Sequence, residues 1–154
     1  MENSDLELRI GYMKDALRAA THSHGLRGKV GIYAVTLDEE FSAWNDLPDN
    51  LPRTKCETEA PTIEESHTLP EVLHAEERLV CDCARMGESL YGAVIYITRT
   101  PCKKCAAHLV QAGIARLYYF SEHPHGDGLP ILKEAGIPYE ELSFEQNILE
   151  DKYL

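Results

Sequence analysis

The sequence predicts an α/β domain in which helices alternate with the strands of a mixed sheet. Segments rich in β-forming residues alternate along the chain with segments whose apolar residues recur at helical spacing. The chain has 154 residues, which is enough for one compact core and too few for two ordinary domains. We therefore expect a single domain over residues 1–154, with mainly parallel pairing after a first hairpin.

The N-terminal part predicts a helix followed by a hairpin. Residues 6–25 carry apolar side chains at helical spacing, and Gly25 supplies a stop. The apolar positions are Leu6, Ile10, Met13, Leu17 and Ala20. Residues 29–45 contain two β-rich runs around an acidic turn at 38–40, which indicates a hairpin that enters the core.

A long acidic loop follows at about residues 46–71. It holds four prolines and seven carboxylates against two basic side chains, without a sustained apolar period. A connection longer than about 15 residues without secondary structure is usually functional or mobile. Two interpretations stay open: a lid or subunit contact, and a solvated insertion.

Helices and strands alternate in the rest of the chain. The predicted elements are a helix at about 73–86 ended by Gly87, a strand at 93–98, a helix that opens at Pro101-Cys102, a strand at 115–120, a short helix at 128–136 and a strand at 138–142. This order is typical of helices packed on a mainly parallel sheet.

Composition restricts the classes of function. The net charge of -11 opposes binding to a long phosphate backbone, because that affinity comes mostly from Lys and Arg. A small anion still fits, since a few local cations can hold one phosphate. No apolar run approaches the roughly 20 residues of a membrane span, and the N-terminus lacks the layout of a signal peptide. We expect a cytoplasmic protein with no membrane or polynucleotide partner.

Two short motifs predict a catalytic zinc site. His74 and Glu76 stand at one predicted helix start, and Cys102 and Cys105 follow Pro101 at another. Two cysteines at i and i+3 share one face of a helical turn, and a helix N-terminus favours the thiolates that bind zinc. Three protein ligands and an open position are typical of catalytic zinc. We therefore predict that His74, Cys102 and Cys105 bind zinc. Glu76 would act as the base, and the combined pattern is the signature of zinc nucleobase deaminases.

The other cysteines leave a structural alternative open. A fourth ligand from Cys56, Cys81 or Cys83 would turn the site into a closed structural zinc. Cys81 and Cys83 lie one to two turns into the helix and point to opposite sides of it, so we interpret both as buried free thiols. Glu77 is interpreted as a solvated helix residue.

The sequence resembles the deoxycytidylate (dCMP) deaminases of the zinc-dependent cytidine and deoxycytidylate deaminase family over about residues 8–142. The superfamily motifs are HAE and PCKKCA, and three further segments agree in order with the nucleotide enzymes: SHGLRGKVG, IYITRTPCKKCAAHLVQAGIARLYYF and LKEAGIPYEEL. Nucleoside-type cytidine deaminases generally have Cys where His74 stands. The resemblance implies a cytidine-deaminase-like three-layer α/β/α domain with a central mixed five-stranded sheet.

By that resemblance the chain converts dCMP to dUMP with release of ammonia, in pyrimidine deoxynucleotide metabolism. It would use one catalytic zinc ion per subunit, with Glu76 passing protons to N3 of cytosine and to the departing amine. The alternatives are a deaminase acting on another cytosine nucleotide or on adenosine in tRNA, and a non-catalytic zinc-binding assembly module.

The resemblance also implies substrate contacts. Asn45, in AWND where the family has G-Y-N-G, would contact the sugar or base. Arg27 matches the arginine of the family's S-x-C-x-R segment and is the candidate for the 5′-phosphate, assisted by Lys29. His123 stands about where many relatives carry a tyrosine near that phosphate. For these cations and for His123, an ordinary surface side chain is the alternative.

Members of the family are commonly oligomers, so the resemblance implies a homo-oligomer, with a hexamer favoured. It also implies regulation by dCTP and dTTP, with Mg²⁺ accompanying a regulatory nucleotide. Arg85 matches a basic position that reaches a neighbouring subunit in some relatives. Lys103 and Lys104 are expected to be exposed, and Trp44 to be pocket wall or core. Four histidines show no partner in the sequence: His22, His24, His67 and His108.

Overall fold

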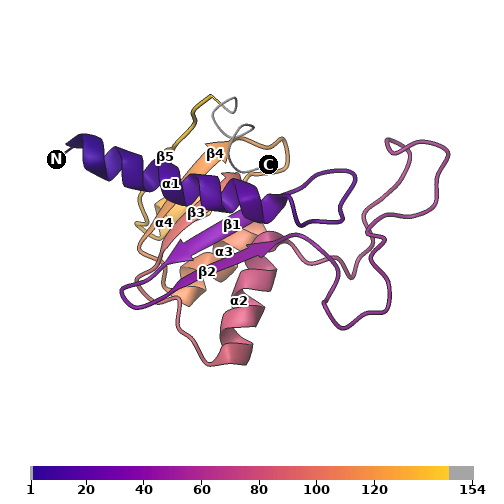
Figure 1. Ribbon diagram of the computed structural model, residues 1–154, viewed down its shortest axis with the longest axis horizontal. Helices are drawn as coiled ribbons and strands as arrows, with labels where there is room; N and C mark the ends of the chain where they lie inside the picture. Colours follow the sequence, from indigo (N-terminus) through magenta and orange to yellow (C-terminus); the bar gives the residue numbers. More distant parts are fainter. Residues whose placement is uncertain (1, 146–154) are drawn as a thin grey trace.

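The computed structural model describes residues 2–145, which form a five-stranded mixed sheet with helices on both faces (Figure 1). The strands are β1 (Gly31–Val35), β2 (Glu40–Trp44), β3 (Val94–Arg99), β4 (Arg116–Ser121) and β5 (Tyr139–Glu141). Their order in the sheet is β2-β1-β3-β4-β5. Strand β1 pairs antiparallel with β2 and β3, whereas β3, β4 and β5 are parallel. The predicted hairpin and the parallel pairing after it are confirmed.

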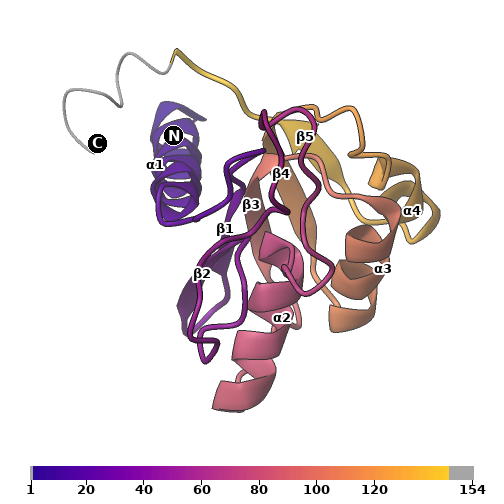
Figure 2. The same ribbon diagram turned by 90° about the vertical axis from the view of Figure 1, so that its right-hand side faces the viewer.

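The helices complete three layers. They are α1 (Glu2–Ala20), α2 (Ala75–Met86), α3 (Lys103–Ala112) and α4 (Leu129–Glu134). Helix α1 lies on one face of the sheet, and α2 and α3 lie on the other, with α4 beside α3 (Figure 2). This is the predicted fold class. No helix within residues 2–145 is long and apolar enough to span a membrane.

The central strand β3 positions the functional end of the sheet. Its side chains alternate between the two faces, so Ile95 and Ile97 pack in the core under α2 and α3 while Tyr96 packs in the core under α1. Burial on both faces stabilises the position of the strand, because its apolar side chains are removed from water on both sides of the sheet. The carboxyl end of β3 therefore delivers Arg99 and the start of α3 to one edge of the molecule.

The acidic segment 46–71 contains no helix or named strand, as predicted, but it is anchored. It contributes to a small apolar cluster, and two isolated bridges, Asp46 with Leu73 and Glu57 with Thr68, hold its two arms together. Glu57 is only 4% exposed, and its Oε1 accepts hydrogen bonds from the backbone N–H groups of Leu26 at 2.7 Å and Arg27 at 3.2 Å. The segment is thus joined to the loop that follows α1.

One of the two cysteines of α2 differs from the prediction. Cys83 is buried, but Cys81 is exposed, so the interpretation of Cys81 as a buried thiol was wrong. Ala75, Leu79 and Cys83 are spaced four apart and all belong to the core that faces the sheet. Cys81 is two positions from Cys83, roughly 200° around the helix, and therefore faces away.

Candidate active site

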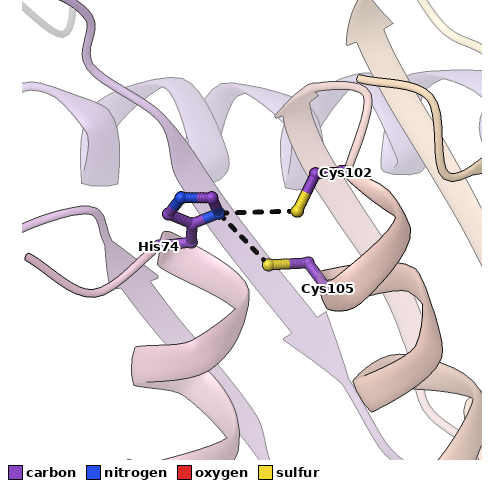
Figure 3. Close-up of side chains that lie close together, drawn as sticks. All are labelled: His74, Cys102 and Cys105. Atoms are coloured by element: carbon purple, nitrogen blue, oxygen red, sulfur yellow. Dashed lines mark hydrogen bonds between the residues drawn. The ribbon is translucent and has the colours of Figure 1, made fainter. Parts of the chain in front are cut away.

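The three predicted zinc ligands converge at the tips of α2 and α3 (Figure 3). His74 and Cys102 are the N-cap residues of the two helices, each with an extended backbone, and Cys105 lies in the first turn of α3. The Nδ1 of His74 lies 3.3 Å from the Sγ of Cys105 and 3.7 Å from the Sγ of Cys102. All three ligand atoms lie within 4.8 Å of one another.

This donor set fits a zinc ion. Tetrahedral sites with Zn–S of about 2.3 Å and Zn–N of about 2.0 Å place N and S ligand atoms about 3.5 Å apart, and the two observed separations bracket that value. Within residues 2–145, no other His, Cys, Asp or Glu joins the group. A fourth ligand from Cys56, Cys81 or Cys83 is therefore not found, and three ligands with an open position are the arrangement of catalytic zinc.

The electrostatics of the donor set also suit a divalent cation. Burial raises the pKa of the Cys105 thiol, and the nearby Glu76 and Cys102 raise it further. Burial likewise raises the pKa of Glu76, against opposing effects of a hydrogen bond with Cys105 and the charge of His74. A bound cation favours both the thiolate and the carboxylate, which is the form of each group that zinc chemistry requires.

Glu76 lies beside the ligand group and is not part of it. The residue is 4% exposed, hydrogen-bonds Cys105 and lines the same cavity as His74. A carboxylate that is buried next to the ligands has few orientations available. A carboxylate in this position can exchange protons with a molecule in the cavity, and the role of Glu76 as base stays a prediction.

Glu77 has a function in the structure that the sequence interpretation missed. Its Oε1 accepts a hydrogen bond from the backbone N–H of His74 at 2.9 Å, so it caps α2 and fixes the ligand's backbone. The glutamate three residues after the N-cap was a signal for this contact in the sequence.

A cavity of about 620 Å³ opens at the ligand group. All three predicted substrate contacts, Arg27, Asn45 and His123, line it. The other lining residues are Gly28, Val30, His67, Thr68, Val72, His74, Ala75, Glu76, Arg99, Thr100, Pro101, Cys102, Pro124 and His125. Arg99 and His67 were not predicted. The position of Arg99 at the end of a strand just before PCKKC was a usable signal, because ligands bind beyond the carboxyl ends of parallel strands.

Arg27 joins the cavity wall to the acidic segment. Its Nη1 donates to the carbonyl oxygens of Ile63 at 3.0 Å, Glu64 at 3.4 Å and Ser66 at 2.5 Å. Lys29, predicted to assist, donates to the carbonyl of Ser23 at 2.8 Å and does not line the cavity. One edge of the Arg27 guanidinium is therefore engaged by the protein itself.

Asn45 braces the same wall. Its Oδ1 accepts from the backbone N–H of Val30 at 2.7 Å, and its Nδ2 donates to the carbonyl of Gly28 at 2.9 Å. Trp44 is neither apolar core nor cavity wall. Its ring packs under the Arg78 guanidinium, 5.1 Å from the ring centroid, and beside His22. The loop after β2 is thus fixed from both sides.

The other predicted side chains have simpler settings. Lys103 and Lys104 are exposed, as expected. Arg85 pairs with Asp82 at 3.3 Å on the surface of α2. His24 contacts Asp46 through Nδ1 at 2.8 Å, a partnership that the sequence did not reveal.

His123 is held by two backbone contacts. Its N–H donates to Thr100 Oγ1 at 3.0 Å, and its Nδ1 accepts from the N–H of His125 at 3.1 Å. Because Nδ1 is an acceptor, the neutral ring carries its proton on Nε2. Burial lowers the pKa of His123, and the charges of Arg99 and His125 lower it further.

Gly126 keeps the loop that carries His123 close to Thr100. A Cβ on Gly126 would lie 2.5 Å from the Thr100 carbonyl oxygen and would overlap its Oγ1. We expect Gly126→Ala to lower the free energy of unfolding by about 1–3 kcal/mol, the usual effect of overpacking, as measured by urea denaturation. Gly11→Ala is the matched control, since Gly11 lies within α1 with nothing within 4 Å of a new Cβ. It should stabilise the protein by about 0.5–1 kcal/mol. An unchanged free energy of unfolding in Gly126→Ala would contradict the close approach of Gly126 to Thr100.

Comparison with solved structures shows a deaminase of similar fold. The dCMP deaminase of cyanophage S-TIM5, in a crystal structure with dCMP and dUMP, superposes with a TM-score of 0.79 and 31% identity. The match covers 88% of this chain and 96% of that one.

Curated relatives match over shorter stretches. ComE operon protein 2 of Bacillus subtilis (strain 168) is 32% identical over 83 residues, which are 52% of this chain and 43% of that protein. The deoxycytidylate deaminase of Enterobacteria phage T4 is 39% identical over 69 residues, which are 42% of this chain and 35% of that protein. The chain thus spans less than half the length of these two proteins.

The family assignment rests on a longer match. The sequence profile described as the cytidine and deoxycytidylate deaminase zinc-binding region matches residues 7–121, and this stretch contains both helix tips and the ligands that they carry. The chain therefore belongs to the cytidine and deoxycytidylate deaminase zinc-binding family.

Proposed function

We propose that the protein is a zinc-dependent hydrolase that deaminates dCMP to dUMP and releases ammonia. The observation that carries this proposal is the group of His74, Cys102 and Cys105 at a cavity of about 620 Å³, with the buried carboxylate of Glu76 beside it. The similarity to dCMP deaminases, one of them crystallised with dCMP and dUMP, supports the choice of a cytosine deoxynucleotide.

The residues of the chain divide the chemistry among them. His74, Cys102 and Cys105 would hold the zinc ion, which when bound lowers the pKa of its water to about 7. Glu76 takes a proton from the attacking water, delivers it to N3 of cytosine and later protonates the departing amine. A C4–O bond forms and the C4–N bond breaks, so dCMP and water give dUMP and ammonia.

The three predicted substrate contacts remain part of the proposal. Asn45 has one amide N–H beyond its bond to Gly28 for the sugar or base. His123 offers Nε2–H, and Arg27 offers the edge of its guanidinium that does not bind the acidic segment. Each lines the cavity, where a nucleotide would bring the groups that these donors recognise.

The zinc-loaded protein should be tested for ammonia release from dCMP, CMP, dCTP, deoxycytidine and adenosine. We expect dCMP to react fastest, with a kcat/KM at least about tenfold above that of deoxycytidine, since a hydrogen bond to a charged group is worth about 1.5–3 kcal/mol. Equal rates for dCMP and deoxycytidine would contradict a phosphate contact. No release from any cytosine compound would contradict the proposal.

Deamination of adenosine in tRNA is the second candidate. The tRNA-specific adenosine deaminase of Agrobacterium fabrum is 38% identical over 68 residues, which are 43% of this chain and 42% of that protein. The net charge of -11 disfavours it, because binding of a long RNA needs a basic face. A stable complex with tRNA at moderate salt, with inosine formation, would favour this candidate.

The expected assembly and regulation stay predictions. A hexamer would be measured by light scattering, and regulation by adding dCTP or dTTP to the ammonia assay. Within residues 2–145, His74, Cys102 and Cys105 form the only group of three or more metal-ligating side chains, so the expected Mg²⁺ gains no support.

A further inference from the structure

The cavity is cationic although the chain is acidic. The charged side chains that line it are Arg27, Arg99 and Glu76, and Glu76 lies beside the metal ligands. The whole chain carries a net charge of -11. A pair of arginines in such a chain concentrates a positive potential in this one concave place, where it favours a small anion.

Arg99 is the arginine that the protein leaves available. No hydrogen bond or ion pair joins its guanidinium to another residue in the part of the chain that the structure describes, and Arg27 by contrast gives Nη1 to three carbonyl oxygens. The half-buried Arg99 reaches from the end of β3 to the opposite wall, where a Cβ on Gly28 would lie 2.9 Å from its Nη1. The missing side chain at Gly28 makes room for this guanidinium.

His123 gives Arg99 a neighbour with a matching donor. Arg99 pairs with Ser121 in the parallel β3–β4 ladder, two residues before His123, and both Arg99 and His123 line the cavity. The charge of Arg99 also contributes, after burial, to the lowered pKa of His123. The neutral imidazole keeps a proton on Nε2, because Nδ1 accepts from His125. A guanidinium and an N–H donor that face one space suit the several acceptor oxygens of a phosphate.

We propose that Arg99, with His123 as a second donor, binds the phosphate of a nucleoside monophosphate in place of Arg27, to which the family resemblance assigns it. Arg27 then acts mainly by holding the acidic segment as a cavity wall. This inference rests on the proposed function for the nucleoside part of the ligand. It adds a specificity-determining residue that favours nucleotide over nucleoside.

The test is calorimetric titration of the zinc-loaded full chain with dUMP and with deoxyuridine, which differ only in the phosphate. The wild-type protein should prefer dUMP. Arg99→Gln should weaken dUMP binding by about 10- to 150-fold, the range for a lost hydrogen bond to a charged group, and leave deoxyuridine binding unchanged. Arg99→Lys should lie between, since it keeps the charge and loses the planar fork.

Arg27→Gln is the matched control. It should weaken both ligands by a similar factor and increase hydrogen exchange over residues 62–67, while the preference for dUMP remains. A loss of that preference in Arg27→Gln, but not in Arg99→Gln, would reverse the assignment. Circular dichroism melting of each variant would establish that the fold is kept.

Several outcomes would overturn the inference: equal binding of dUMP and deoxyuridine by the wild type, unchanged dUMP binding in Arg99→Gln, or a parallel loss of both ligands in a folded Arg99→Gln or Arg99→Lys. The proposed function fails separately. If Arg99→Gln removes the preference for dUMP but the wild type releases no ammonia from any cytosine compound, the phosphate site stands and the deaminase proposal falls.

Discussion

Replacing Glu76 with glutamine should lower the rate of ammonia release from dCMP by about 10²- to 10⁴-fold, the range that positioned proton transfer contributes. The amide has the same shape but cannot take a proton from water or return one to the leaving amine. Since Glu76 lies beside the ligand group and outside it, bound zinc should stay near one ion per chain. The measurements are steady-state ammonia release and zinc content by atomic emission.

Glu88→Gln is a suitable control for this substitution, because Glu88 is an exposed carboxylate just beyond α2. It should keep full activity and full zinc. Activity retained in Glu76→Gln would refute the role of Glu76 as proton carrier. A wild-type protein that binds zinc but releases no ammonia would instead favour the non-catalytic assembly module, which has no need of a buried carboxylate at the ligand group.

Zinc affinity should rise with pH, and Cys105 should contribute one proton to that dependence. Burial, then Glu76 and Cys102, raise the pKa of the Cys105 thiol, so at neutral pH the metal-free protein holds a proton there that zinc must displace. Lower pH therefore favours the metal-free state. We expect the apparent Kd for zinc to change by about tenfold per pH unit for each proton displaced, as measured by competition with a chelator.

Two serine variants separate this effect from general damage. Loss of a hydrogen bond that supports a metal ligand lowers metal affinity by about 10- to 100-fold, and Cys105→Ser should lower zinc affinity by more than that. The pH dependence of zinc affinity should also fall by one proton. Cys81→Ser should retain both affinity and slope, because Cys81 is exposed on α2 and is not part of the ligand group. An unchanged slope in Cys105→Ser would show that Cys105 is not a ligand.

The ligand group was predictable because its signals are local. His74 and Cys102 each precede a helix whose start can be read from a few neighbouring residues, and the motif PCKKC places both thiols in one turn. The alternation of helices and strands likewise predicted the fold class. Both inferences needed only short stretches of sequence.

The rest depended on contacts between distant parts of the chain. Arg27 holds the acidic segment through hydrogen bonds to residues 36 to 39 positions further along the chain. The periodicity of a sequence does not predict contacts over such separations. The Arg99 guanidinium is available to a ligand because, among the described residues, no neighbouring side chain forms a hydrogen bond or an ion pair with it, and a sequence does not show such an absence. Cys81 was assigned to the core because the outward direction of a helical position is fixed only by the sheet against which α2 packs.

The location of two donors at helix starts has a consequence for maturation of the protein. His74 and Cys102 are 28 positions apart, with α2 and β3 between them, so their spacing exists only after both helices have docked on the sheet. A nascent or misassembled chain would offer the donors separately and capture the ion weakly. Zinc would then bind late in folding and stabilise the folded state. Incorrectly folded molecules would have no deaminase activity, instead of a reduced rate.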